Sequence, residues 1–150
     1  FSLLIQIKSS GFEILKILRD SGIPTVVWMT PILPFINDTE ENIIGILNCC
    51  KEAKVFGVIC FGMGLTLREG NREYFYSELD KKFPQLKEVY MRKYGSSYIV
   101  GSRDNKRLMN IFHDFCEANN IVHDNDLIFS YLNLFEDKQF TKQISFFDKI

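Results

Sequence analysis

Apolar residues recur along the first half of the chain in two patterns, a helical spacing and short continuous runs. Residues 14–18 form a short helical face that ends at a Ser-Gly stop, and 24–29 (PTVVWM) has the continuous apolar character of a buried strand. Asp38, with Glu41 three residues on, forms an acidic variant of a capping box ahead of a second helical face. A second buried strand follows at 56–61 (FGVICF). Because a parallel crossover needs a dozen or more residues, this order predicts a parallel β-α-β unit.

The second half of the chain predicts helix after helix. One helix ends near Phe83, and the next runs from Pro84, a favoured first helical residue, to Gly95, a favoured C-cap. A loop over about 95–103 leads to a helix with a regular apolar face that closes near Asn119. Acidic residues at 124 and 126 open the last helix.

These elements divide the chain into three parts. We expect an α/β segment over 1–70, a helical region over 71–135 and a mobile tail over 136–150. Two strands are too few to close a sheet, and their edges would be exposed. We therefore expect that part of the fold lies upstream and that this piece, which starts on Phe1 and has the character of an excised segment, self-associates as a homo-oligomer.

Composition narrows the class of protein. The chain has 150 residues, 46% hydrophobic and 25% charged, which is the size and composition of one ordinary globular domain. No apolar run reaches the roughly 20 residues that span a bilayer, so we expect a cytoplasmic protein without membrane contact. The four cysteines show no CxxC spacing, which predicts buried free thiols and neither a zinc site nor a disulfide framework.

Two stretches resemble a known family. "GIPTVVWMTPILPFINDTEENI" and "FGMGLTLREGNREYFYSELDKKFPQLKEVYMRKYG" resemble the C-terminal half of radical SAM proteins of the spore photoproduct lyase-like group, often called DNA repair photolyases. The resemblance covers roughly residues 12–135. Its specificity comes from the combination of the turn P-x-x-P-x-x-N-D with the aromatic run that follows.

The resemblance implies the C-terminal part of a partial (β/α) barrel, followed by a helical C-terminal region. In such a barrel the strand ends hold S-adenosylmethionine against a [4Fe-4S] cluster, and the enzyme is a lyase or oxidoreductase that uses a 5′-deoxyadenosyl radical, here with DNA lesions as one candidate substrate. The family's CxxxCxxC loop is absent from this sequence. We therefore assign no metal ligand or catalytic residue, and we expect both cofactors to belong to the full-length protein and neither to bind this chain alone.

By the resemblance, two strand ends carry the cofactor-binding residues. The resemblance assigns backbone and apolar contacts with the nucleoside to Pro31, Ile32 and Leu33, and support of the following helix to Asn37. Phe61 and Gly62, at the end of the next strand, would lie alongside, and Gly62 would let the backbone approach adenine closely. The alternative for the first loop is a rigid strand-to-helix turn with a helix cap, and the alternative for Gly62 is a simple bend.

Basic and aromatic residues suggest a substrate side. Residues 81–107 hold eight Lys and Arg against two acids, interleaved with aromatic rings, which is a candidate DNA surface. The residues assigned to it are Arg68, placed by the resemblance at the barrel mouth, with Lys87, Arg92, Lys93 and Tyr98. The alternative is a set of solvated helix faces. Neither histidine has the surroundings of a catalyst.

One further motif lies in the tail. Residues Gln143–Phe147 (QISFF) resemble the short peptide by which bacterial replication and repair proteins dock on the sliding clamp, and the alternative is a tail that packs back on the helices. Two functions stay open: the C-terminal portion of a radical SAM enzyme, and a non-catalytic nucleic-acid or protein-binding module.

Overall fold

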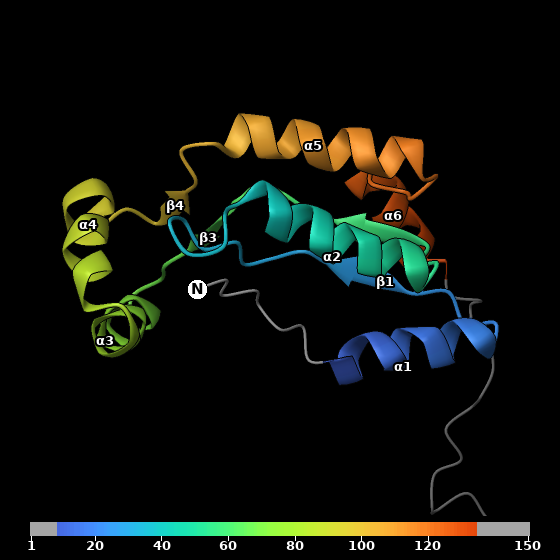
Figure 1. Ribbon diagram of the computed structural model, residues 1–150, viewed down its shortest axis with the longest axis horizontal. Helices are drawn as coiled ribbons and strands as arrows, with labels where there is room; N and C mark the ends of the chain where they lie inside the picture. Colours follow the sequence, from blue (N-terminus) through green and yellow to red (C-terminus); the bar gives the residue numbers. More distant parts are fainter. Residues whose placement is uncertain (1–8, 135–150) are drawn as a thin grey trace, which may run out of the picture.

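The computed structural model describes residues 9–134; residues 1–8 and 135–150, including Gln143–Phe147, lie outside the described part. This part consists of six helices and four three-residue strands (Figure 1). The elements are α1 (Ser9–Asp20), β1 (Val26–Trp28), α2 (Glu40–Glu52), β2 (Gly57–Ile59), β3 (Gly64–Thr66), α3 (Asn71–Lys82), α4 (Pro84–Tyr94), β4 (Ile99–Gly101), α5 (Asn105–Ala118) and α6 (Asn125–Leu132).

The predicted β-α-β unit is present. Strands β1 and β2 pair in parallel with Val27 opposite Val58, and the pairing continues past β1, where the Met29 N–H donates to the Ile59 carbonyl (2.9 Å). On the other side of β2, an isolated parallel bridge joins Gly57 to Val122. The chain therefore has the mixed helix and strand class that the sequence predicted, although both strands are shorter than the apolar runs that contain them.

The N-cap of α2 lies one residue after Asp38, the cap that the sequence predicted. Thr39 has extended backbone angles and its hydroxyl accepts a hydrogen bond from the Asn42 N–H (3.3 Å), so Thr39 is the N-cap. The carboxylate of Asp38 instead accepts a hydrogen bond from the Ser102 hydroxyl (2.6 Å). Asp38 thus links two distant parts of the chain, a contact that local spacing cannot reveal.

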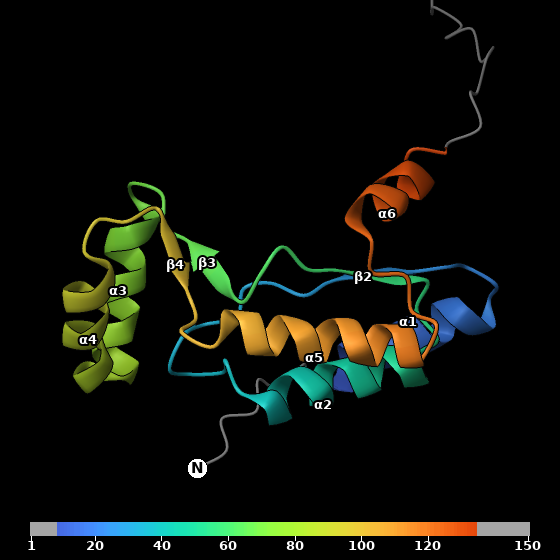
Figure 2. The same cartoon turned by 90° about the horizontal axis from the view of Figure 1, so that it is seen from above.

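One face of the parallel strands carries the main core. Helices α2 and α5 pack together over this face through the apolar sides that their helical spacing predicted. The fully buried side chains include Ile43, Leu47 and Cys50 from α2 and Leu108, Phe112 and Cys116 from α5. Seen from above, α1, α2 and α5 lie on one side of the strands and α6 lies on the other (Figure 2).

The segment 95–103, predicted as a loop, contains a strand. Strand β4 pairs antiparallel with β3, with Gly64 opposite Gly101. A Cβ at Gly64 would lie 2.5 Å from the Val100 carbonyl oxygen, so this pairing requires glycine. The sequence did not reveal the pair because three residues are too few to show an alternating pattern.

Helices α3 and α4 pack around the β3–β4 pair and form a second core, which includes Leu67, Leu79, Tyr90 and Val100. Tyr90 is fully buried, and its hydroxyl donates a hydrogen bond to the Pro34 carbonyl in the loop after β1 (2.5 Å). This bond ties the helical region to the α/β segment. No helix within 9–134 has both the length and the apolar character needed to cross a bilayer.

Two glycines should respond to the same substitution with opposite signs. A Cβ at Gly57 would lie 2.8 Å from the Val122 carbonyl oxygen and 2.9 Å from Ile128 Cδ1, whereas a Cβ at Gly45 in α2 has nothing within 4 Å. We expect Gly57→Ala to lower the free energy of unfolding by about 1–3 kcal/mol. We expect Gly45→Ala to raise it by about 0.5–1 kcal/mol, because alanine favours the helix.

Urea denaturation of both variants at equal protein concentration measures the two changes. A Gly57→Ala protein as stable as the parent would contradict the close packing of α6 on β2.

Candidate functional site at the carboxyl ends of β1 and β2

The two parallel strands end at the same edge, and the loops that follow them are hydrogen-bonded to each other. The Ile32 N–H donates to the Gly64 carbonyl (3.1 Å), so the loop after β1 and the segment after β2 form one layer. In α/β folds the carboxyl ends of parallel strands are the usual place for ligands. This edge is therefore the candidate functional site.

The loop after β1 is held by side-chain amides. Asn37 is 1% exposed, and its Oδ1 accepts a hydrogen bond from the Leu33 N–H. The Asn37 carbonyl accepts from Asn42 Nδ2 (2.9 Å), which fixes the loop to the first turn of α2. Within the described residues Asn37 Nδ2 is buried without a hydrogen-bond partner. Asn37 thus joins the loop after β1 to α2, while its assignment to a cofactor site stays a prediction.

The three preceding candidates lie in different surroundings. Pro31 is exposed and Leu33 is half-buried, but Ile32 is 2% exposed and belongs to the core beneath α2 and α5. The side chain of Ile32 is therefore packing, and its backbone N–H already bonds to Gly64. Of the three residues, Pro31 is the most exposed.

The segment after β2 is held by α5. The Met63 N–H donates to Asn105 Oδ1 (2.7 Å), and the Met63 carbonyl accepts from the Ser102 N–H (2.7 Å). Gly62 has a φ of +143°, which favours glycine, and a Cβ there would lie 3.3 Å from Asn105 Oδ1. Gly62 is thus part of a hydrogen-bonded corner, and its close approach to adenine stays a prediction.

Aromatic rings gather on the strand face opposite the main core. Phe61 lies 5.9 Å from Trp28 and 6.3 Å from Phe129 between ring centroids, and Trp28 lies 6.1 Å from Phe129. Phe61 is 67% exposed and Trp28 is 53% exposed, so their faces are accessible to a planar ligand. Sequence analysis included Phe61 and missed the other two rings. The alternation of side chains along a strand could have placed Trp28 and Phe61 together, whereas nothing local indicated Phe129.

A polar cluster at the starts of α2 and α5 was also missed. The Ser102 hydroxyl donates to Asp38 Oδ2 and accepts from the Asp104 N–H (3.1 Å), while Arg107 pairs with Glu40 (2.7 Å). Arg103, Asp104, Lys106, Arg107 and Asn110 line a hollow of about 370 Å³ at the start of α5. The polar sequence Ser-Arg-Asp-Asn at 102–105, where α5 begins, was the feature of the sequence that could have indicated this cluster.

Two of the predicted substrate residues meet on the β3–β4 pair. Arg68 follows β3 and Tyr98 precedes β4, and a hydrogen bond from the Arg68 guanidinium lowers the pKa of the Tyr98 phenol, with a further hydrogen bond from Thr66. The same contact raises the pKa of Arg68. Tyr98 is 48% exposed and Arg68 is exposed, so the pair combines an accessible cation with an accessible ring.

The three basic candidates on α4 are not equivalent. Lys87 pairs with Asp80 of α3 (2.6 Å), and Lys93 Nζ lies 4.8 Å from the centre of the Phe35 ring. Arg92 is exposed and has no ion pair within the described residues. The local excess of positive charge in the sequence is thus partly offset by acids from outside that stretch.

Cysteine and histidine side chains do not form a metal centre in the described part of the chain. Burial raises the pKa of Cys50 and Cys116 to about 12, and it also raises the pKa of Cys60. These thiols are protonated near neutral pH. The His113 and His123 rings lie 5.1 Å apart, but residues 9–134 contain no group of three His, Cys, Asp or Glu placed to hold a metal ion.

The Arg68–Tyr98 contact predicts a measurable titration shift. In Arg68→Gln we expect the pKa of the Tyr98 phenol to rise toward its ordinary value of 10.0, because the guanidinium that stabilises the phenolate is gone. NMR titration of the Tyr98 ring measures the change. Arg92→Gln removes an equal charge from α4 and should leave the pKa of Tyr98 nearly unchanged. Equal pKa values in the parent and Arg68→Gln would contradict the contact.

Comparisons of this chain with family models, with curated proteins and with solved structures find no match.

Proposed function

We propose that this chain is the C-terminal portion of a radical SAM enzyme, in which β1, α2 and β2 are late elements of a partial (β/α) barrel. The observation that supports the proposal is the parallel β-α-β unit, whose two strand-end loops are joined by the Ile32–Gly64 hydrogen bond. In such folds the strand-end edge binds ligands. The sequence resemblance adds S-adenosylmethionine as the ligand.

The strand-end edge offers groups that suit a nucleoside. Phe61 is an exposed ring for stacking, and Pro31 adds apolar surface. Gly62 has no side chain that would keep a ligand away from its backbone. The unused buried donor of Asn37 is a polar group of the same loop. When bound to its cluster, S-adenosylmethionine would supply the 5′-deoxyadenosyl radical. The part assigned to this chain is to hold the nucleoside and to fix the two loops.

The cysteines of this chain do not fit an iron–sulfur cluster. Cluster ligands are thiolates on closely spaced residues, whereas Cys50 lies in α2, Cys60 follows β2 and Cys116 lies in α5, and all three thiols have raised pKa values. No step through a cluster is therefore derived from these residues. In the proposed enzyme the ligands come from upstream sequence.

The substrate side is proposed to be the β3–β4 pair with α3 and α4. These elements lie beyond the carboxyl ends of β1 and β2 (Figure 1), the side from which a barrel receives its substrate. Arg68 offers a cation for a phosphate, and Tyr98 offers a ring for an unstacked base. DNA is thus the proposed substrate class.

The second candidate is a non-catalytic nucleic-acid-binding module. It rests on the same Arg68–Tyr98 pair and on the exposed Arg92, and it needs no cofactor. Reading the coding sequence upstream of Phe1 separates the two. An in-frame CxxxCxxC loop supports the enzyme, and a start codon directly before Phe1 contradicts it.

We expect the isolated chain, reconstituted anaerobically with iron and sulfide, to show no charge-transfer absorbance and no cleavage of S-adenosylmethionine. The physical reason is that it lacks the three-thiolate loop that such a cluster needs. Absorbance spectroscopy and chromatography of the products provide the measurement. A stable [4Fe-4S] signal from this chain would show that its own cysteines serve as ligands.

If α4 contacts DNA, the combined change Lys87→Ala, Arg92→Ala and Lys93→Ala should weaken binding. It should also flatten the slope of log K against log salt by about 0.9 for each lost phosphate contact. Fluorescence anisotropy with labelled duplex DNA at several salt concentrations measures both effects. Tyr98→Ala should weaken single-stranded binding with little change in slope, because stacking is largely uncharged.

The matched control changes Lys16, Lys51 and Lys54 to Ala, which removes the same charge from α1, α2 and the turn after α2. The control should retain the parent's affinity and slope. Equal losses of affinity in both triple variants would show that net charge alone causes the effect, and would contradict a contact between α4 and DNA.

A further inference from the structure

The two faces of the β1–β2 pair are covered differently. Val27 and Val58 pack into the main core beneath α2 and α5. Because side chains alternate along a strand, Trp28 faces the other side, on which α6 lies (Figure 2). Phe61, after β2, lies beside Trp28 at a centroid distance of 5.9 Å. At the carboxyl ends of the strands this second face therefore carries aromatic side chains.

Helix α6 covers only part of the second face. Ile128 is fully buried, and a Cβ at Gly57 would lie 2.9 Å from its Cδ1, so α6 packs on the start of β2. At the other end of the strand pair, Trp28 is 53% exposed and Phe61 is 67% exposed. Both rings lie near Phe129 of α6, at centroid distances of 6.1 Å and 6.3 Å. Trp28, Phe61 and Phe129 thus form an aromatic cluster with open surface.

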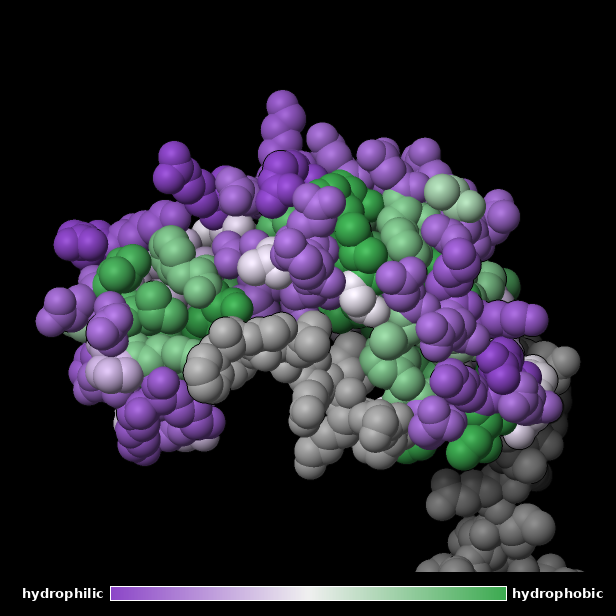
Figure 3. Space-filling model, in the orientation of Figure 1, coloured by the Kyte–Doolittle hydropathy of each residue, from purple (hydrophilic) through white to green (hydrophobic). Residues whose placement is uncertain are grey.

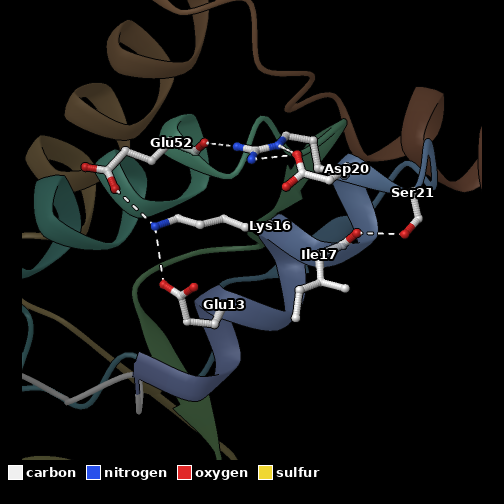
Figure 4. A network of polar contacts seen from close by, with 7 residues as sticks. Glu13, Lys16, Ile17, Asp20, Ser21 and Glu52 are labelled. Carbon is white, nitrogen blue, oxygen red and sulfur yellow. Dashed lines mark hydrogen bonds and ion pairs between the residues drawn. The ribbon is translucent and has the colours of Figure 1, made fainter.

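The main-core side, in contrast, is covered by helices with polar outer surfaces. Helix α1 is fixed beside α2, because Arg19 donates to the Glu52 carbonyl (2.8 Å) and Lys16 lies 3.9 Å from the Glu52 carboxylate (Figure 4). Hydrophilic residues predominate on the surface over α2 and α5 (Figure 3). The exposed rings of the strand pair are therefore confined to the second face.

One polar atom next to the aromatic cluster has no partner. Asn125 and Phe129 lie one turn apart and therefore on the same side of α6. Asn125 Nδ2 donates to the Cys60 carbonyl (3.4 Å), directly before Phe61. Asn125 Oδ1 is buried without a hydrogen-bond partner in the described residues. Because an unpaired buried acceptor is costly, a ligand with an N–H group at its edge suits this position.

We propose that the aromatic cluster, with Asn125, binds an unstacked base of a single DNA strand. Aromatic faces stack on any base. The N–H groups at the edge of a base are donors of the kind that Asn125 Oδ1 lacks. An aliphatic ligand would use the area of the rings but neither of these properties. Because DNA is the substrate class proposed above, this site rests on that proposal and adds a second base position to that of Tyr98.

The chain connects the aromatic cluster to the Arg68–Tyr98 pair. Residues 62–67 lead from Phe61 through β3 to Arg68. The bond from the Met63 N–H to Asn105 Oδ1 (2.7 Å) and the pairing of β3 with β4 fix this connection. The β3–β4 pair lies beyond the carboxyl ends of β1 and β2 (Figure 1). A DNA strand that contacts Arg68 and continues along β3 toward β2 therefore brings its next bases to the aromatic cluster.

The fluorescence of Trp28 tests the site directly, because Trp28 is the only tryptophan of the chain. Titration with unlabelled single-stranded oligodeoxyadenylate of about ten nucleotides should quench this fluorescence, since a stacked base lies against the indole. The same oligonucleotide with a terminal fluorescent label reports, through its anisotropy, binding to any part of the chain. The two measurements separate contact at the aromatic cluster from binding elsewhere.

Phe61→Leu keeps apolar surface at an exposed position and removes one stacking ring. It should weaken binding by about 5-fold to 100-fold and reduce the quenching of Trp28, while the slope of log K against log salt stays unchanged. Phe115→Leu makes the same change in α5, on the other side of the strands, and is the matched control. The control should retain the parent's affinity and quenching. A folded Phe61→Leu protein with the parent's affinity would overturn the proposal.

The titrations of the parent decide the matter even where Phe61→Leu does not fold. Binding by anisotropy without quenching of Trp28 would overturn this site and leave the Arg68–Tyr98 pair as the proposed interface. No binding by anisotropy would contradict DNA as the substrate and overturn the site with it. Equal quenching by adenosine at the same concentration of bases would assign the cluster to a free nucleoside. Fluorescence that changes with protein concentration without DNA would assign it to a second copy of the chain, and either result overturns the proposal.

Discussion

The parallel pairing of β1 with β2 is the constraint on which the other features of this structure depend. Two parallel strands cannot be joined by a tight turn, so α2 must return the chain across one face. That return places both strand ends, and the start of the helix between them, at one edge. The hydrogen bonds from Ser102 to Asp38 and from Met63 to Asn105 lie at this shared edge.

Backbone hydrogen bonding explains why side-chain amides are so frequent at this edge. Strands of three residues leave most N–H and C=O groups of the adjoining loops without ladder partners, and buried groups of this kind are costly. Asn37, Asn42 and Asn105 supply the partners for Leu33, the Asn37 carbonyl and Met63. Side-chain amides thus satisfy part of the backbone of the candidate site, and within the described residues Asn37 Nδ2 is left buried without a partner.

Electrostatics and topology both change the interpretation of the helical region. A window of sequence counts the charges within it, whereas the folded chain pairs Lys87 with Asp80 and Arg107 with Glu40, acids that lie before the window. The β3–β4 pair also joins segments more than 30 positions apart and brings Arg68 to Tyr98. The net positive charge of the candidate nucleic-acid surface is therefore smaller than the count over 81–107 indicates. Two of its residues, Arg68 and Tyr98, are brought together at the β3–β4 pair.

The sequence by itself determined the elements whose signal is local. It predicted the apolar faces of α2 and α5, the helix start at Pro84 and the two buried strands. The reason is that burial of one face of a helix, or of a whole strand, fixes the spacing of apolar residues that are neighbours in the sequence. The tertiary structure alone decided the pairing of β3 with β4, the burial of Ile32, the third ring from Phe129 and the bond between Ser102 and Asp38. Each of these depends on contacts between residues that are distant along the chain. Such contacts produce no periodic pattern in the sequence around either partner, so local spacing cannot predict them.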